Sequence, residues 1–344
     1  MGNRQSFVVP LSVCVVCLVC VRCYRVHRAL KSNILTYGEL PGFVYLSARY
    51  VVRAVGRRPG CLYGAPGKRL HYRLCDSRLE THALRQFCGA AGYGADYPDS
   101  EYRDIPLCFP EVLCCRLMLL ALTHDDFRLS PAGLVRVRQT LRTFQPIDEL
   151  KKGPFTLQVQ VLEYQQTDVG VEVDVRLSAA SHCGSPVWES CVTLLSRRKL
   201  TSHNQPQESE QRESSAEEVK QVELSVPRMT GLSCSWSFSE FSPHRLHSVP
   251  LRFFGFRSEM TAGLWMLSIC LAEIEKHKGV KVVTAPVRVS AHFEEPLMVP
   301  GNISLSFWKT IRGEGLSSAE DVCCFHMRQD GRDVSHVVGR IIRA

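Results

Sequence analysis

Alternation of apolar and polar residues, in two separate blocks of the sequence, is the feature that most restricts the fold. The first block holds "LQVQVLEY" (157–164) and "VGVEVDVRL" (169–177). The second holds "VTAPVRVSAHF" (283–293) and "NISLSFW" (302–308). Successive side chains of a strand point to opposite faces, so a period of two between turn signals indicates half-buried antiparallel strands.

A helix is predicted ahead of each block. "PEVLCCRLMLLALTHDDF" (110–127) is long, apolar and free of glycine, and "AGLWMLSICLAEIEKH" (262–277) carries apolar residues at helical spacing. Each half of the chain therefore consists of a long apolar helix and several strands. We expect an α+β fold in which two curled antiparallel sheets each wrap a central helix.

Composition divides the chain into four parts. Residues 32–200 and 222–344 carry the two helix-and-strand units, and residues 1–31 precede them. Residues 201–221 are polar and almost free of large apolar side chains, so burial cannot repay the entropy of ordering them. We predict that 201–221 is a linker between two domains.

The N-terminal residues predict attachment to a membrane. "SFVVPLSVCVVCLVCV" (6–21) is continuously apolar. Four basic residues follow it: Arg22, Arg25, Arg28 and Lys31. The stretch is short for a spanning helix, but the positive charge after it favours a signal anchor with the body of the chain in the cytosol. A cleaved signal peptide, myristoylation at Gly2 and a buried helix are the alternatives.

Cysteine usage and charge restrict the compartment and the partners. Several of the 16 cysteines lie inside apolar runs, and some are adjacent in sequence, which favours reduced thiols over a disulfide framework. The net charge is +8, but the basic residues are scattered, so nucleic acid is not an expected partner. The histidines and cysteines do not show metal-ligand spacing, and we expect no metal site.

Two motifs carry a family resemblance. "RFFGF" (252–256) and "AGLW" (262–265) resemble the segment that leads into the helix of the MaoC-like acyl-thioester dehydratases and hydratases, which have a double hot-dog fold. The resemblance extends over residues 106–305 and makes the first half a degenerate hot-dog domain. It implies an acyl thioester of coenzyme A or phosphopantetheine as substrate, with no other cofactor, and it leaves monomer and homodimer open.

The sequence departs from the family where the reaction takes place. An ungapped alignment from Arg252 puts the family's Asp at Glu240, its Asn at Ser242 and its His at Arg245, and retains Pro243. Arginine stays protonated at physiological pH, so Arg245 cannot act as the base that the histidine supplies.

A neighbouring histidine is the predicted replacement. His244 and His247 flank Arg245, and in a helical turn they share a face with Glu240 one turn earlier. Glu240 with His244 or His247 is therefore the predicted acid–base pair. Two half-exposed loop histidines without a catalytic role are the alternative.

The resemblance also implies an oxyanion donor and a substrate-binding set. In the family, the N–H of a glycine at the start of the helix polarises the thioester carbonyl, and Gly263 holds that position after Ala262, where the family has a histidine. Ser242, Arg245 and Arg252 are the predicted substrate-binding residues, the arginines through phosphate groups.

Two functions follow. One is a 3-hydroxyacyl-thioester dehydratase or 2-enoyl-thioester hydratase. The other is a catalytically inactive, membrane-anchored hot-dog protein that binds an acyl thioester or a protein partner.

Overall fold

The computed structural model describes most of the chain from Ser32 onward, and the statements below concern only these residues. They are 32–65, 69–94, 97, 104–198, 217–226, 259–260, 263–299, 301–311, 321–329 and 334–343, together with Cys17, Val21 and Tyr24.

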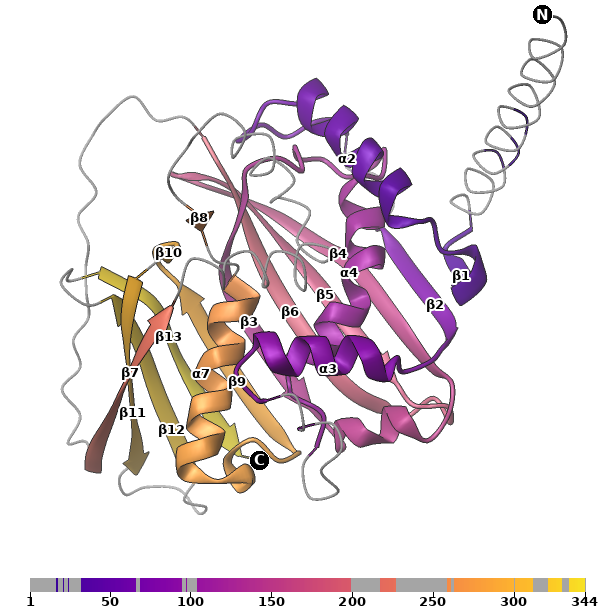
Figure 1. Ribbon diagram of the computed structural model, residues 1–344. Coiled ribbons are helices and arrows are strands. Elements are labelled where there is room, and N and C mark those ends of the chain that lie inside the picture. The colour runs from indigo at the N-terminus through magenta and orange to yellow at the C-terminus, as the bar shows by residue number, and fades with distance from the viewer. Residues whose placement is uncertain are drawn as a thin grey trace, which may run out of the picture.

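A single sheet of 11 strands runs through both halves of the molecule (Figure 1), in the order β1-β2-β4-β5-β6-β3-β9-β13-β12-β11-β7. Its strands from the first half are β1 (Ile34–Thr36), β2 (His71–Ser77), β3 (Leu134–Thr143), β4 (Phe155–Thr167), β5 (Gly170–Ala180) and β6 (Pro186–Arg197). Those from the second half are β7 (Glu217–Val226), β9 (Val287–Phe293), β11 (Gly301–Ile311), β12 (Asp321–Gln329) and β13 (Val334–Arg343). The two-residue strands β8 (Glu259–Met260) and β10 (Met298–Val299) pair separately.

The two halves repeat one arrangement. Outward from the centre of the sheet, the first half has the order β3-β6-β5-β4-β2 and the second half β9-β13-β12-β11-β7. In each half the outermost of these strands comes first in sequence, a helix follows it, and four strands complete the unit. The antiparallel pair β3–β9 joins the halves, with Thr143 opposite Val287. The predicted α+β architecture is therefore confirmed, but the two predicted sheets are joined through β3–β9 into one.

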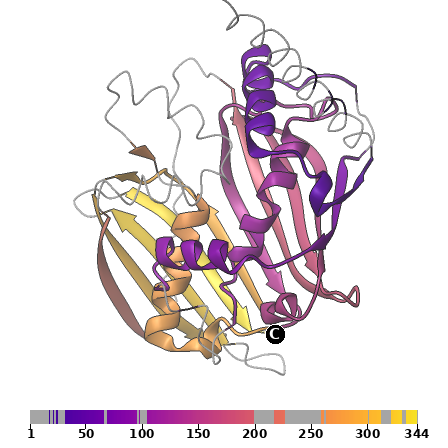
Figure 2. The same cartoon turned by 45° about the vertical axis from the view of Figure 1, so that its right-hand side comes forward.

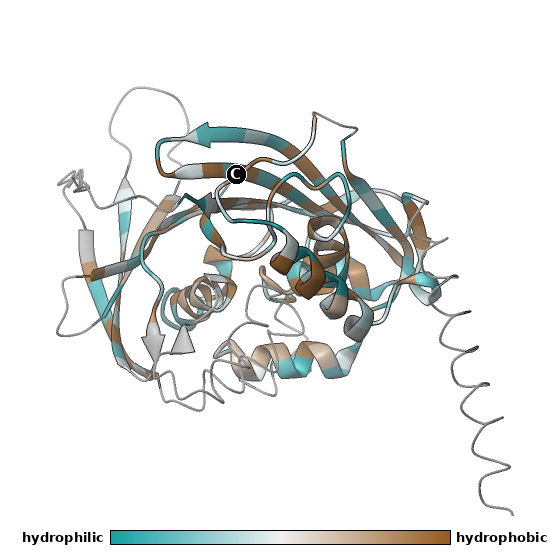
Figure 3. Ribbon diagram, turned by 90° about the horizontal axis from the view of Figure 1, so that it is seen from above, coloured by the Kyte–Doolittle hydropathy of each residue, from teal (hydrophilic) through white to brown (hydrophobic). Residues whose placement is uncertain are grey.

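The two central helices are α4 (Phe109–Leu122) and α7 (Gly263–Lys278). The sheet curves around the helices when the molecule is seen from above (Figure 3). The strand alternation explains the packing, because one face of β4 buries Phe155, Leu157 and Val159 while the residues between them are partly exposed.

Two further helices lie in a region that the sequence analysis left without assigned elements. These are α2 (Phe43–Gly56) and α3 (Thr81–Ala90). Helix α3 lies across the space between α4 and α7 (Figure 2), and the indole N–H of Trp265 on α7 donates to the carbonyl of Ala90, 2.8 Å away. Three short 3-10 helices complete the fold: η1 (Tyr37–Glu39), η3 (Ile147–Lys151) and η5 (Val280–Val282).

One boundary differs from the sequence expectation. Strand β7 begins at Glu217, so residues 217–221 of the predicted linker belong to the sheet. As the outermost strand, β7 pairs with β11 alone, and residues 219–221 are exposed, so a polar sequence is compatible with this position.

The N-terminal segment 1–31 lies outside the described residues, apart from Cys17, Val21 and Tyr24, which are helical and exposed. Among the helices that the structure describes, none combines the length and the apolar character needed to cross a bilayer. All of the cysteines in the described ranges are free thiols.

Candidate active site

Of the predicted site residues, Gly263 is the one that the structure describes. It is the first residue of α7, as the motif "AGLW" predicts. The other six lie within residues 227–258, outside the described residues, and their roles stay predictions: Glu240, Ser242, His244, Arg245, His247 and Arg252.

Gly263 is confined by side chains from both halves of the molecule. A Cβ atom added at this residue would lie 3.1 Å from Cδ of Arg136 on β3, and 3.2 Å from the ring of Phe293 on β9. Such contacts are tighter than ordinary van der Waals packing, so a side chain at this position would have to displace its neighbours. The N-terminus of α7 is thus in contact with the central strands β3 and β9.

Arg136 belongs to a buried polar cluster that includes Glu111, Gln139 and Ser190. Its guanidinium forms an ion pair with Glu111, whose side chain is only 1% exposed. The amide of Gln139 donates to the other carboxylate oxygen of Glu111 at 2.7 Å and also lies 3.0 Å from the hydroxyl of Ser190. Both carboxylate oxygens of Glu111 therefore have partners, as a buried charge requires.

A second contact connects the starts of the two helices. The thiol of Cys108, directly before α4, is hydrogen-bonded to the hydroxyl of Ser268 on α7. Burial, together with the nearby carboxylate of Glu111, raises the pKa of Cys108 to about 12. Cys108 is therefore a neutral thiol at physiological pH and is unsuited to act as a nucleophile.

The two helix starts differ in charge. Glu111 lies in the first turn of α4, where a carboxylate is stabilised by the positive end of the helix dipole. The first turn of α7 has no acidic residue. Its positive end is therefore not neutralised by the helix itself, and the Gly263 end of α7 can stabilise negative charge on a bound group.

A separate cavity of about 200 Å³ lies at the other end of α7. Its lining consists of apolar and basic residues: Val282, Val322, Cys323 and Ile341, with Lys278, Lys281, Lys309 and Arg343. Because α7 has 16 residues, this cavity lies roughly 20 Å from Gly263 along the helix axis and does not extend the site at Gly263.

The sequence analysis did not identify Glu111, Arg136, Gln139 or Phe293. One signal was present for Glu111, because it is the only acidic residue within the apolar run from Phe109 to Leu122. A carboxylate in a buried helix needs a partner. The sequence does not show which of the 42 basic residues that partner is.

Solved structures of MaoC-like dehydratases share this fold. HtdX of Mycobacterium tuberculosis aligns with a TM-score of 0.57 at 15% identity, over 79% of this chain and 98% of its own. A MaoC-like dehydratase from Phytophthora capsici also aligns with a TM-score of 0.57 at 15% identity, over 84% of this chain and 98% of its own. A conserved hypothetical protein of Mycobacterium tuberculosis with a double hot-dog fold aligns with a TM-score of 0.50 at 9% identity, over 81% and 96% of the two chains.

These comparisons define the class of protein by its fold. The chain is a double hot-dog protein with the architecture of MaoC-like dehydratases, and the resemblance predicted from its motifs is confirmed at that level. No protein-family model matches the sequence, and no curated protein does so significantly.

Proposed function

We propose that this chain binds an acyl thioester at the N-terminus of α7 and acts as a 3-hydroxyacyl-thioester dehydratase or 2-enoyl-thioester hydratase. The observation that carries the proposal is the position of Gly263 at the start of α7, in a first turn without acidic residues. The N–H of Gly263 and the positive end of the helix suit the negative charge that develops on the thioester oxygen.

The reaction also needs an acid and a base on the same face of the substrate. For dehydration, the base removes the proton at C2, and the acid gives a proton to the leaving 3-hydroxyl as the C2–C3 double bond forms. Glu240 with His244 or His247 is the pair that we propose, since Glu240 holds the position of the family's Asp and the two histidines flank the position of its His. Ser242, Arg245 and Arg252 would hold the substrate.

Arg136 and Phe293 would act through Gly263. Their side chains contact the start of α7 from β3 and β9, so they fix where the Gly263 N–H lies relative to the substrate carbonyl. The charge of Arg136 is balanced by Glu111, which favours a positioning role over direct stabilisation of the enolate.

The test is an assay in which the full chain hydrates a 2-enoyl thioester of coenzyme A. The rate is measured from the loss of absorbance of the conjugated thioester. E240A is expected to lower the rate at least ~100-fold, because general acid–base groups contribute on that order. The matched control is E163A, at an exposed glutamate on β4. Equal rates for the two variants would remove Glu240 from the site.

A second variant separates the enzyme from the inactive binding protein. R245H restores the histidine that the family has at this position. If His244 or His247 already acts as the base, R245H brings no gain in kcat and raises KM, because the proposed contact of Arg245 with the substrate is lost. If the wild-type chain binds the thioester without turnover and R245H acquires turnover, the inactive alternative is correct.

Membrane anchoring is a separate proposal. The apolar stretch 6–21 and the basic residues after it would hold the chain to a membrane with its body in the cytosol. Replacing Val15 and Val16 with aspartate should release the protein into the soluble fraction, because a charge inside an apolar membrane segment is strongly unfavourable. Unchanged membrane association of that variant would place the anchor elsewhere.

A further inference from the structure

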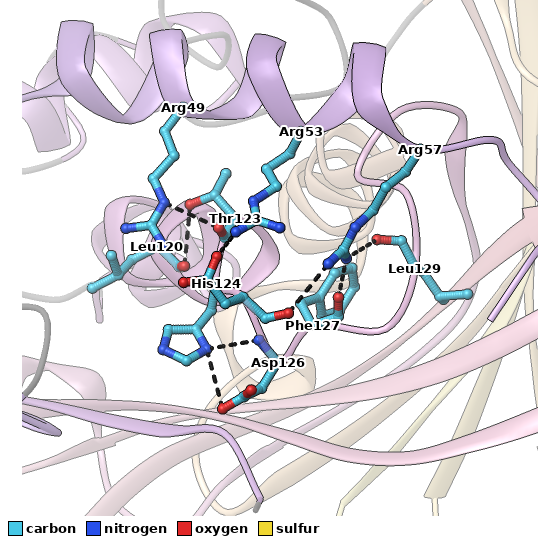
Figure 4. A network of polar contacts seen from close by, with 10 residues as sticks. Arg49, Arg53, Arg57, Leu120, Thr123, His124, Asp126, Phe127 and Leu129 are labelled. Carbon is cyan, nitrogen blue, oxygen red and sulfur yellow. Dashed lines mark hydrogen bonds and ion pairs between the residues drawn. The ribbon is translucent and has the colours of Figure 1, made fainter. Parts of the chain in front are cut away.

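Helix α2 turns its arginines toward the protein. Arg49, Arg53 and Arg57 follow one another at intervals of four residues and point from α2 to the end of α4 and the loop after it (Figure 4). Arg49 Nε donates to the carbonyl of Thr123 at 3.1 Å, and Arg57 donates to that of Leu129 at 3.2 Å. The last carbonyls of a helix have no partner within the helix and carry its negative end, so cations stabilise them.

The same side of α2 is fixed by buried packing. Tyr50 is fully buried, and its hydroxyl donates to the carbonyl of Pro131 at 3.0 Å. Leu46 is also fully buried. Together with the arginine contacts, these residues determine the rotation of α2 about its own axis.

The rotation leaves an apolar face of α2 exposed. Val51, Val52 and Val55 are 45%, 71% and 83% exposed. Helices on the surface of globular proteins usually bury such a stripe and expose their charged residues. In α2 the charged side is held by α4 and its following loop, and the valines are directed outward.

Exposed apolar side chains are concentrated in the part of the sequence that contains α2. Among the described residues, the exposed large apolar side chains are Val21, Tyr24, Ile34, Tyr37, Val51, Val52, Val55 and Val219. All of them except Val219 lie within residues 21–55, although the described residues extend to 343. Ile34 is on β1, only a few residues after the basic end of the segment 1–31.

We infer that the outward face of α2 (Val51, Val52 and Val55), with Ile34 and Tyr37, rests on an anionic lipid surface. The inference rests in part on the proposed anchoring by the segment 1–31. The apolar stretch 6–21 of that segment ends 13 residues before Ile34, so a bilayer that holds it lies at most about 45 Å from the start of β1. The basic residues of the segment 1–31 suit anionic headgroups, and exposed valines gain free energy on entering the acyl region.

The contact can be measured in the full chain. With vesicles of phosphatidylcholine and phosphatidylserine, V52E/V55E should weaken binding about tenfold or more, because two valines leave the apolar phase and two anions enter it. V219E is the matched control, since Val219 is 56% exposed on the distant edge strand β7, and it should bind as wild type does. Equal thermal unfolding of the variants would show that α2 still folds.

Insertion has its own readout. The fluorescence of V52W should be quenched by lipids with brominated acyl chains beyond the level of the wild-type tryptophans, whereas that of V219W should not. If the full chain binds vesicles and V52W is not quenched, the inference is overturned and the anchor stands. If the full chain does not bind vesicles, both the inference about α2 and the proposed anchoring by the segment 1–31 are wrong.

A second copy of the chain on this face, or independent action of the two membrane-binding surfaces, would each give a distinct result. If a second copy of the chain covers it, V52E/V55E will convert a dimer to a monomer and leave vesicle binding unchanged, which would overturn the inference. If V15D/V16D weakens vesicle binding and the addition of V52E/V55E abolishes it, the segment 1–31 and the face of α2 bind the membrane independently. The inference then holds.

Discussion

The helices α4 and α7 occupy equivalent places in the two halves, but different groups interact with their ends. Helix α4 starts with Pro110 and Glu111, and the carboxylate of Glu111 is buried against Arg136. Helix α7 starts with Gly263 and has no acid in its first turn. The first half therefore uses the positive end of its helix for an internal ion pair, while the first turn of α7 contains no acid of its own to pair with that end.

The C-terminal ends differ in a parallel way. The last carbonyls of α4 and of the loop after it are bonded by arginines from α2. Helix α7 ends with its own basic residues, followed by Gly279 at a φ of 86°, whose N–H donates to the carbonyl of Glu275 at 2.9 Å. Both ends of α4 are thus held by side chains from other elements. The N-terminal turn of α7 has no such acidic partner, which is why the proposed site is at α7.

The largest expected effect comes from breaking the ion pair at α4. E111A should lower the free energy of unfolding by about 3–5 kcal/mol, because it leaves the charge of Arg136 largely buried without its partner. E111Q should be intermediate, since it keeps one acceptor. Urea unfolding measures both.

The control for this substitution lies two residues along the same strand. Arg138 pairs with Glu172, but the Arg138 side chain is 49% exposed. E172A should lower stability by at most about 1 kcal/mol. Equal effects of E111A and E172A would mean that burial does not distinguish the two pairs.

The next effect concerns the start of α7. G263A should lower the free energy of unfolding by about 1–3 kcal/mol, because its Cβ would press on Arg136 and on the ring of Phe293. G89A, in α3, should instead raise it by about 0.5–1 kcal/mol, since nothing lies near the added atom and alanine favours helix. Thermal unfolding of both variants tests this, and a stabilising G263A would contradict the account.

A smaller effect is expected where α3 contacts α7. W265F removes the hydrogen bond to the carbonyl of Ala90 and should lower the free energy of unfolding by about 1 kcal/mol. W188F removes the equivalent bond to the carbonyl of Leu107 in the first half and should have a similar effect. Hydrogen exchange separates them, because only W265F should accelerate exchange in α3. Unchanged α3 amides in W265F would show that Trp265 does not hold that helix.

The smallest effect is on reactivity and leaves the fold unchanged. Cys183 lies between β5 and β6, and hydrogen bonds from the hydroxyls of Ser181 and Ser185 lower its pKa to about 6. In the second half, burial raises the pKa of Cys323 on β12 to about 11. Iodoacetamide should therefore alkylate Cys183 with a midpoint near pH 6 and spare Cys323 at pH 7, as peptide mass spectrometry can measure.

The variant S181A should move that midpoint to higher pH, because it removes the hydrogen bond that stabilises the thiolate most. An unchanged midpoint in S181A would assign the low pKa to another cause.

Local pattern was sufficient for most of the second half of the fold. Strand β9 and helix α7 fall on the segments whose periodicity predicts them, because the alternation or stripe of apolar residues there records burial on one face. The motif around Gly263 likewise determines the start of α7, since the resemblance covers the residues that enter the helix.

Pattern was insufficient where a helix is oriented by polar contacts. Helix α2 contains arginines and valines on different sides, and its sequence alone does not show which side faces the protein. The contacts of Arg57 with the carbonyls of Asp125 and Leu129 connect residues 68 and 72 positions apart. Such bonds exist only after α4 and the loop following it have been placed.

The sequence by itself determined that this protein has two helix-and-strand units, with a motif in the second that resembles the entry to the central helix of MaoC-like dehydratases. Short-range periodicity and one continuous motif are sufficient to indicate both properties. Only the tertiary structure decided what surrounds that motif. Arg136 reaches Glu111 from 25 residues away and touches Gly263 from the other half of the chain. Contacts between residues so distant in sequence depend on the packing of the central strands β3 and β9, which short-range periodicity does not specify.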